Sequence, residues 1–332
     1  MKRLLRLAGF TVLAMGMTTL VGCGPKNEDV AAAGPHDSGI RVKIGVSVPA
    51  ADHGWTAGVG WWAERAKAMY PNVEWVYQTA GTPGKQISDI EDMMAQKVQA
   101  LVILATESGP LTDVAERAHE RGIYIVNVDR GFTKQGIADV FLEGDNEAFG
   151  RKSAEYMAKK LGKGKKIVIL RGIPCTVDTA RFEAAMKVFN QEGIEVLGSL
   201  PGMWNQEKSL ACMQTFLSQY KHIDAVWASD DDMALGCEKA IREAGRADEM
   251  WILGGAGMKD IIKKVMDKDP MYPADITYPP SMIATGIHLA VASMRDGNQK
   301  AVSEFMPKHI VMDVEMVTPE NAKNYYFPKS VY

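Results

Sequence analysis

The sequence AVWASDDDMALGCEKAIREAG at residues 225–245 contains the pattern that decides the fold. Ala225–Ala228 is a short apolar run typical of a buried β-strand, and the periodicity of Asp232–Ala244 predicts an amphipathic helix. Asp232 stands where the N-cap of this helix belongs, and Gly245 follows the helix where a left-handed residue is common. Residues 225–245 therefore predict one unit of strand, turn and helix.

Similar units run through the chain from Ile40 onward. The other predicted strands are Arg41–Val48, Val73–Tyr77, Ala100–Leu104, Tyr124–Val128, Lys166–Leu170, Glu195–Leu200 and Met250–Leu253. Predicted helices between them include Thr56–Met69, Gly84–Gln96, Leu111–Arg121, Asn146–Leu161 and Asp178–Gln191. Asp145 is a further expected N-cap, and Gly122 and Gly193 are expected to follow helix ends. Such alternation requires right-handed crossovers and a parallel sheet covered on both faces.

The alternation of strands and helices runs through the chain twice. The first round covers about residues 40–143 and the second about 144–278. A last helix at about Pro280–Arg295 and two short strands at about His309–Met312 and Val314–Val317 follow. The predicted fold class is α/β, with two doubly wound, Rossmann-like parallel-sheet domains. In such sheets, ligands bind beyond the carboxyl ends of the strands.

The N-terminal segment predicts export. Three basic residues, Lys2, Arg3 and Arg6, precede the apolar run Leu7–Val21, which is shorter than the ~20 residues that a membrane-spanning helix needs. The run ends in Leu-Val-Gly-Cys23, which resembles the lipobox of bacterial lipoproteins. Residues 1–22 are therefore predicted to be a lipoprotein signal peptide, Cys23 the lipidated residue and 23–39 a flexible tether. The alternative is an ordinary secretory signal beside a chance cysteine.

Composition excludes several classes of function. Without residues 1–22 the chain has 35 basic and 41 acidic residues, a net charge of −6 that gives no electrostatic footprint for nucleic acid. No CxxC or HExxH motif predicts a metal site, and no cofactor is predicted. Cys175, Cys212 and Cys237 allow one disulfide at most. The glycine-rich residues 254–257 lack the Gly-Lys-Ser/Thr that a phosphate loop requires.

Polar and aromatic residues follow the predicted strands, where a ligand of a doubly wound sheet is expected. These residues are Asp52, His53 and Trp55, then Asp129 and Arg130, then Arg181, Trp204 and Asp230. Carboxylates and guanidinium groups make paired hydrogen bonds to neighbouring hydroxyls, while indoles cover the apolar faces of a sugar ring. The strand ends therefore predict a sugar site.

Four segments resemble the ribose-binding type of periplasmic sugar-binding proteins. They are IGVSVP at 44–49, IVNVDR at 125–130, AVWASDDDMALG at 225–236 and EAGRADEMWILGG at 243–255. The resemblance extends from Ile40 to about Val317 and implies the type I periplasmic binding protein fold. It implies one domain of residues 40–143 plus 280–312 and another of 144–279 plus 313–332. Three crossover segments are implied near Gly144, near Tyr278–Pro280 and near Met312–Val314.

Position by position, the resemblance implies eight ligand-binding residues. They are Asp52, Trp55, Asp129, Arg130, Arg181, Trp204, Asp230 and Tyr278. Asp129 and Arg130 correspond to the hydroxyl-binding pair of the first domain, and Arg181 to the arginine of the second. Trp55, allowing a one-residue insertion, and Trp204 correspond to the stacking aromatics. The alternatives are an ion pair at a strand end for Asp129 and Arg130, and core packing for the two tryptophans.

The remaining positions depart from the family pattern. Asp52, with the same insertion, falls on a polar ligand position, Asp230 replaces an asparagine of ribose binders, and Tyr278 replaces a glutamine near the hinge. Ala256 replaces an aspartate and cannot accept a hydrogen bond through its side chain. Loss of such a charged partner weakens binding by about 1.5–3 kcal/mol. The ligand is therefore expected to be sugar-like but not ribose.

The resemblance implies an exported, lipid-anchored, monomeric solute-binding protein with no enzymatic activity. It would close on a monosaccharide or polyol and deliver it to the membrane permease of an ABC importer. Two alternatives remain: signalling of the closed form to a chemoreceptor or sensor kinase, and a carbohydrate-active enzyme that uses Asp129 and Asp230 as acid and base. A sugar-responsive repressor is disfavoured because the N-terminus has an export signal in place of a DNA-binding helix pair.

Overall fold

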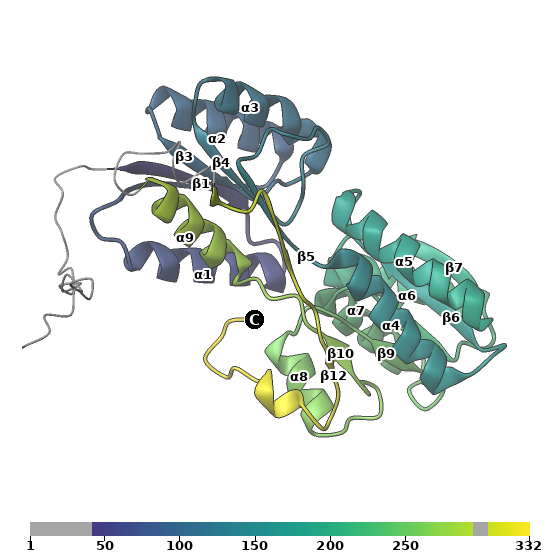
Figure 1. The fold of residues 1–332 in the computed structure, drawn as a ribbon. Coiled ribbons are helices and arrows are strands. Elements are labelled where there is room, and N and C mark those ends of the chain that lie inside the picture. The colour runs from purple at the N-terminus through teal and green to yellow at the C-terminus, as the bar shows by residue number, and fades with distance from the viewer. Residues whose placement is uncertain (1–41, 295–304) are drawn as a thin grey trace, which may run out of the picture. The chain divides into compact units, whose positions relative to one another are not determined.

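The computed structural model describes residues 42–294 and 305–332. The predicted signal peptide, lipidation site and tether lie outside the described residues, as do the predicted strand start at Arg41 and helix end at Arg295. Within the described residues, two separate parallel sheets are each covered by helices (Figure 1). The prediction of two doubly wound parallel sheets is therefore confirmed.

The first sheet has six parallel strands in the order β11-β5-β4-β3-β1-β2. Their bounds are β1 Lys43–Pro49, β2 Glu74–Ala80, β3 Ala100–Ile103, β4 Tyr124–Val128, β5 Val140–Gly144 and β11 His309–Met312. Helices α1 (Gly54–Ala68) and α9 (Met282–Met294) cover one face, and α2 (Pro83–Ala95) and α3 (Ser108–Glu120) cover the other (Figure 1). Burial on both faces explains why β1, β3 and β4 are almost continuously apolar.

The second sheet has four parallel strands in the order β7-β6-β8-β9. They are β6 Lys166–Arg171, β7 Glu195–Pro201, β8 Ala225–Ala228 and β9 Trp251–Leu253. Helix α4 (Asn146–Leu161) packs against α5 (Thr176–Glu192), and α6 (Gln206–Gln219) packs against α7 (Asp231–Glu243). A short ladder joins β10 (Asp275–Ile276) to β12 (Met316–Val317), near α8 (Lys259–Met266) and the 3₁₀ turn Ala322–Asn324.

Most predicted elements are present with ends shifted by a few residues, and β4, β8, β11 and α4 have the predicted bounds. The strand predicted at Val314–Val317 is shorter, since only Met316–Val317 pairs with β10. The predicted elements do not include β5, β10 or α8. Strand β10 has two residues and exists only through its pairing with β12, so no local periodicity marks it.

The helix ends correct one prediction. Asp145 caps α4 as predicted, because its Oδ1 accepts a hydrogen bond from the Ala148 amide at 2.7 Å. The N-cap prediction for Asp232 is wrong: Asp230 caps α7 by accepting from the Met233 amide at 3.1 Å. Predicted helix-ending glycines do adopt left-handed backbone angles, with φ of 70° at Gly193 and 67° at Gly245.

The carboxylate of Asp231 holds the glycine-rich loop that follows β9. Its two oxygens accept hydrogen bonds from the amides of Gly255 and Met258, both at 2.8 Å. A Cβ at Gly254 would lie 2.2 Å from Asp231 Oδ1, so this position has no room for a side chain. Glycine is therefore required at 254 and 255 because neighbouring atoms pack closely there. The two hydrogen bonds to Asp231 fix the position of Ala256.

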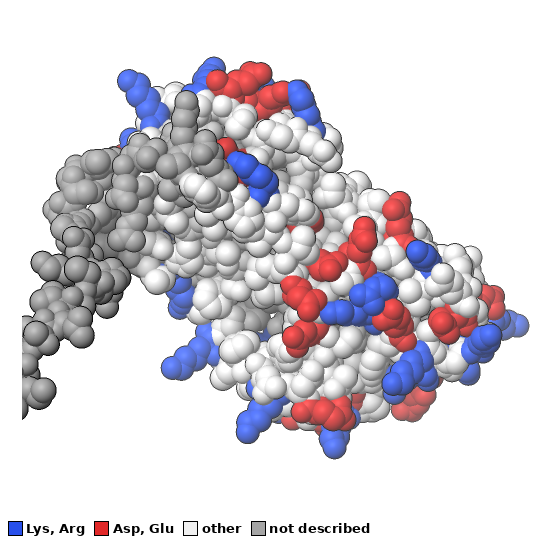
Figure 2. Space-filling view, in the orientation of Figure 1, with Lys and Arg blue, Asp and Glu red and all other residues white. Residues whose placement is uncertain are grey.

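Charged side chains on the visible face are interspersed by sign over the helices of both sheets (Figure 2). Many form exposed pairs, such as Arg151 with Glu155 at 3.1 Å. Exposed pairs of this kind contribute only about 0–1 kcal/mol each. Stability therefore depends mainly on the apolar contacts between the sheets and their helices. None of the helices in the described ranges has both the length and the apolar character of a membrane-spanning segment.

Helices α4 and α5 approach each other closely at Gly150. A Cβ built at Gly150 would lie 2.0 Å from the carbonyl oxygen of Arg181, a backbone atom that cannot turn aside. The absence of a side chain at 150 therefore sets the position of α5, and with it the direction of the Arg181 side chain.

Gly150→Ala should destabilise the protein by about 1–3 kcal/mol or more, because the new methyl group forces the α4 and α5 backbones apart. The free energy of unfolding in urea measures this loss. The matched control is Gly60→Ala in the middle of α1, where the nearest atom to the new Cβ is Tyr77 Oη at 3.5 Å. That variant should gain about 0.5–1 kcal/mol through helix propensity. Equal stability of the two variants would contradict the packing role of Gly150.

Candidate functional site

A small cavity is lined by residues that follow strands of both main sheets. Its lining consists of His53, Trp55, Asp129, Arg130, Val177, Arg181, Trp204, Asp230, Ala256 and Tyr278. The lining includes every predicted ligand-binding residue except Asp52. The structure thus brings together residues that are far apart in the sequence, such as Trp55 and Tyr278, which are 223 positions apart.

Asp129 and Arg130 enter the cavity from the end of β4. Asp129 has a left-handed backbone with φ of 67°, and its amide donates to the Leu142 carbonyl at 2.7 Å. Arg130 is fixed by two hydrogen bonds from Nη1 to the carbonyls of Ala105 (3.1 Å) and Thr106 (2.8 Å). Its Nε lies 3.6 Å from Asp129 Oδ2, too far for a hydrogen bond. Arg130 Nε is buried and has no hydrogen-bond partner within residues 42–294 and 305–332.

Arg181 enters from α5 on the side of the second sheet. Its Nε donates to Asn146 Oδ1 at 3.0 Å, and its Nη1 donates to the Ser229 carbonyl at 2.9 Å. The guanidinium carbon lies 3.9 Å from the ring centre of Phe149 and 4.2 Å from that of Tyr278. These contacts fix the plane of the guanidinium group, and the two hydrogen bonds leave Nη2 for another acceptor.

Asp230 is the second carboxylate of the cavity. One oxygen caps α7, which leaves Oδ2 available to a ligand. Burial raises the pKa of Asp230 to about 7, and repulsion from Asp232 adds to this, while His53, the Met233 amide and Arg181 act in the opposite direction. The Asp230 carboxyl therefore titrates close to neutral pH.

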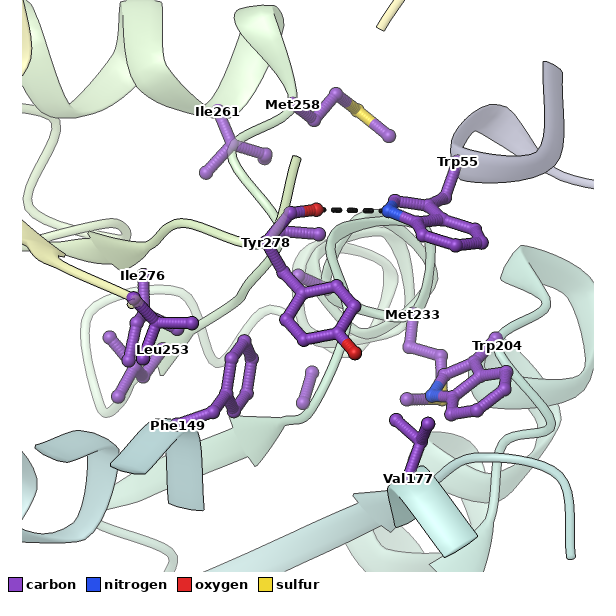
Figure 3. Packing of buried hydrophobic residues seen from close by; sticks show 14 of the residues in the cluster. Trp55, Phe149, Val177, Trp204, Met233, Leu253, Met258, Ile261, Ile276 and Tyr278 are labelled. Atoms are coloured by element: carbon purple, nitrogen blue, oxygen red, sulfur yellow. Dashed lines mark hydrogen bonds between the residues drawn. The ribbon is translucent and has the colours of Figure 1, made fainter. Parts of the chain in front are cut away.

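Tyr278 connects the elements around the cavity. Its hydroxyl donates to Asp129 Oδ1 at 2.6 Å and accepts from the Gly144 amide (3.3 Å) and Asn146 Nδ2 (3.2 Å). Its carbonyl accepts from Trp55 Nε1 at 2.9 Å, as Figure 3 shows. In the same view the phenol points into the space between the indoles of Trp55 and Trp204. Tyr278, predicted to lie near a hinge, thus makes three hydrogen bonds through its hydroxyl group.

Two indoles flank this space. Trp204 follows β7 with a left-handed φ of 52°, and a Cβ at Gly172 would lie 2.1 Å from its ring. The Arg130 guanidinium lies 5.1 Å from the centre of the Trp204 ring, so a residue of the first sheet faces one of the second. Both Trp55 and Trp204 are 5% exposed. Within the described chain Trp204 Nε1 has no hydrogen-bond partner.

Asp52 differs from the other predicted residues in its position. Its side chain is 75% exposed and lies at an adjoining pocket, with Oδ1 2.6 Å from His53 Nδ1. The hydrogen bond from His53 lowers the pKa of Asp52 to about 2. Burial lowers the pKa of His53, but its bond to Asp52 and the charges of Asp230, Asp52 and Asp232 raise it above the ordinary value. These neighbours therefore favour the protonated form of His53, and Asp52 orients its ring.

Three lining residues, Asp129, Trp204 and Ala256, have positive φ angles although none is glycine. Such backbone costs about 1–3 kcal/mol and is concentrated at functional sites. Ala256, with φ of 102°, is held by a hydrogen bond that its amide donates to the Ile276 carbonyl at 2.7 Å. It also forms an isolated β-bridge with Thr277. The strain supports a functional role for the cavity, and no residue pattern in the sequence marks it.

The arrangement suits a neutral, hydroxyl-rich ligand. Each sheet contributes one carboxylate and one guanidinium group: Asp129 with Arg130, and Asp230 with Arg181. These groups offer acceptors and donors in pairs, and the indoles offer apolar faces. One oxygen of each carboxylate also accepts a hydrogen bond from the protein, Asp129 from the Tyr278 hydroxyl and Asp230 from the Met233 amide. No cluster of metal-ligating side chains occurs in the part of the chain that the structure describes.

Comparison with known proteins gives consistent matches. Residues 44–299 match the family described as periplasmic binding protein domain. The ribose import binding protein of Bacillus subtilis is 31% identical over 199 residues, which cover 60% of this chain and 64%, just under two thirds, of that protein. The structure of the fructose-binding periplasmic domain of a hybrid two-component system is 27% identical, with a TM-score of 0.76 and coverage of 86% of this chain and 93% of that one.

A further solved structure is similar in fold. An ABC transporter solute-binding protein from Bacillus halodurans, with bound myo-inositol, has a TM-score of 0.78 and covers 88% of this chain and 98% of its own. Its sequence is only 22% identical, so this likeness concerns the fold.

Asp230→Asn should change how stability depends on pH. The wild-type carboxyl binds its proton more tightly folded than unfolded, so wild-type stability falls as pH rises from about 4 to about 7. Asparagine still caps α7 and removes this loss. The free energy of unfolding of the variant, relative to that of the wild type, should therefore rise by a few kcal/mol between pH 4 and pH 8. Urea unfolding at both pH values measures this change.

The control for this experiment is Glu249→Gln. A hydrogen bond from Arg246 lowers the pKa of Glu249 to about 2. The contribution of the Glu249 carboxylate to stability is therefore present above pH ~4 and lost in acid. Glu249→Gln should therefore lose stability relative to the wild type as pH rises. A pH-independent difference between Asp230→Asn and the wild type would contradict the assigned titration.

Proposed function

The chain belongs to the family of periplasmic binding protein domains, and from this we propose that it captures a monosaccharide or related polyol as the extracytoplasmic solute-binding protein of an ABC importer. The observation that carries the proposal is the cavity itself, in which each sheet supplies one carboxylate and one arginine. The similarity to a ribose import binding protein supports the same class of ligand. The eight predicted residues are proposed as its binding site, with Asp52 acting through His53.

Capture is proposed to occur by closure of two domains. One consists of residues 40–143 plus 280–312 and the other of 144–279 plus 313–332. The pairing of β11 with β5 and the packing of α9 on the first sheet support this division. The chain passes between the sheets near Gly144, near Tyr278–Pro280 and near Met312–Val314. A ligand that bonds to both sheets favours the closed state, since equal affinity for both states would shift nothing.

The unused hydrogen-bonding groups define the class of ligand. Asp129 Oδ2 and Asp230 Oδ2 remain as acceptors, while Arg130 Nε and Trp204 Nε1 are buried donors without partners in the described chain. A buried donor left unpaired costs about 1–3 kcal/mol, so a hydroxyl oxygen that accepts from it gains that amount. Ala256 offers no side-chain acceptor in this ring of groups. The proposed ligand is therefore a compact polyhydroxyl compound other than ribose.

Sensing is the second candidate function. The similar fructose-binding domain is the periplasmic part of a hybrid two-component system. The same closed form could be recognised by a chemoreceptor or sensor kinase in place of a permease. Deletion of the coding sequence distinguishes the two: loss of uptake of the bound sugar supports transport, while unchanged uptake with loss of the transcriptional or chemotactic response supports sensing.

Export and anchoring complete the proposal. Membership of a periplasmic family supports export, as does the basic and apolar start of the chain. We place the lipid on Cys23 and a flexible tether at 23–39, which would keep a monomeric binding protein beside its permease without spanning the membrane. No enzymatic activity is proposed, because the matching family is one of binding proteins.

One sugar or polyol from a panel of pentoses, hexoses, deoxysugars and polyols should raise the melting temperature by several degrees. At 1,000 times its dissociation constant a ligand adds about 4 kcal/mol of stability. Asp129→Ala and Arg181→Ala should abolish the shift. Shifts with nucleosides or amino acids alone would overturn the ligand class, and chemical turnover of the bound sugar would replace the binding function with an enzymatic one.

Cys23→Ser should release the protein from the membrane fraction. Without a thiol at position 23 no lipid is attached, and residues 24 onward have no other predicted anchor. Fractionation after metabolic labelling with a palmitate analogue measures both changes, with Cys212→Ser as the control. A Cys23→Ser protein that stays in the membrane fraction would contradict the anchor.

A further inference from the structure

A carboxylate of the second sheet binds the N-terminus of a helix that belongs to the first. Both oxygens of Asp232, in α7, lie 3.1 Å from the amide nitrogen of Gly54, the first residue of α1. Burial raises the pKa of Asp232, while the backbone amides of Gly54 and Trp55 act in the opposite direction. Asp232 is 8% exposed, and it does not line the ligand cavity. This contact therefore joins the two sheets without using the ligand site.

Helix α1 is suited to such a partner. Its first turn contains no acidic residue of its own, although the free amides there carry a partial positive charge. Gly54 also allows a close approach, since a Cβ at this position would lie 3.1 Å from Asp232 Oδ2 and 3.0 Å from the Tyr332 ring. Asp232 thus supplies, from the opposite sheet, the carboxyl group that accepts from this first turn.

The same helix turn carries residues of the cavity. Trp55 lines the cavity directly, and His53 precedes α1. Holding the first turn of α1 against α7 therefore holds these side chains at the distance that encloses a ligand. Because observed affinity equals intrinsic affinity multiplied by the closed fraction, a contact that stabilises closure tightens binding without touching the ligand.

We propose that Asp232 is a positioning residue that stabilises the closed arrangement of the two sheets and so raises ligand affinity. The proposal rests on the proposed binding function for its effect on affinity, but the contact itself can be tested without any ligand. Charge-assisted hydrogen bonds of this kind correspond to about a 10- to 100-fold effect on an equilibrium.

The first test is amide hydrogen exchange of the exported protein without added ligand. In the wild type the amides of Gly54 and Trp55 should exchange at least about tenfold more slowly than in Asp232→Ala. Asp232→Asn retains an acceptor oxygen and should recover part of the protection. The control is Asp260→Ala, which removes an exposed acidic residue from the first turn of α8. Equal exchange in the wild type and Asp232→Ala would overturn the proposal.

The second test is binding of D-ribose, D-allose, xylitol and myo-inositol to the same proteins. Any probe that binds the wild type should bind Asp232→Ala about 10- to 100-fold more weakly, mainly through faster dissociation, with Asp260→Ala unchanged and Asp232→Asn intermediate. Unchanged affinity in Asp232→Ala would overturn the proposal. If the exchange result holds while the wild type binds no sugar or polyol at all, the proposed function fails and the contact between α7 and α1 stands.

Discussion

The hydrogen bond between the Tyr278 hydroxyl and Asp129 is the interaction on which the site depends. Both groups are almost fully buried, so breaking the bond would leave a carboxylate oxygen and a phenol without water to replace it. The same hydroxyl accepts from Gly144 and Asn146, where the chain passes from the first sheet to the second. A single phenol thereby fixes the crossing point, one carboxylate of the cavity and, through its ring, the plane of Arg181.

Much of the fold was predictable because its signals are local. The strand at Ala225–Ala228 and the helix that follows it are marked by apolar periodicity within one short segment. The polar pair Asp129 and Arg130 was also predictable, because parallel strands place their carboxyl ends at one edge. Strand β10 was not, since it exists only through its pairing with β12. The capping role of Asp230 was missed although its bond to the Met233 amide is local, because Asp230, Asp231 and Asp232 are all residues that can cap a helix.

Other features of the site are not marked in the sequence. His53 was a candidate from its place after β1, but its orientation by Asp52 is a relation that two neighbouring residue types do not specify. The backbone strain at Asp129, Trp204 and Ala256 is invisible in residue types that normally avoid positive φ. A ligand site can therefore be located from strand ends, while its exact lining depends on buried contacts between the two sheets.

The close contact between Gly172 and the Trp204 indole constrains the history of this cavity. A side chain at 172 and an indole at 204 cannot coexist, because the Cβ would lie 2.1 Å from the ring. Tryptophan can therefore arise at 204 only where 172 is already glycine, and the glycine can be replaced only after the indole is gone. Changes at these two positions are thus possible only in a fixed order, which is opposite for gaining and for losing the ring.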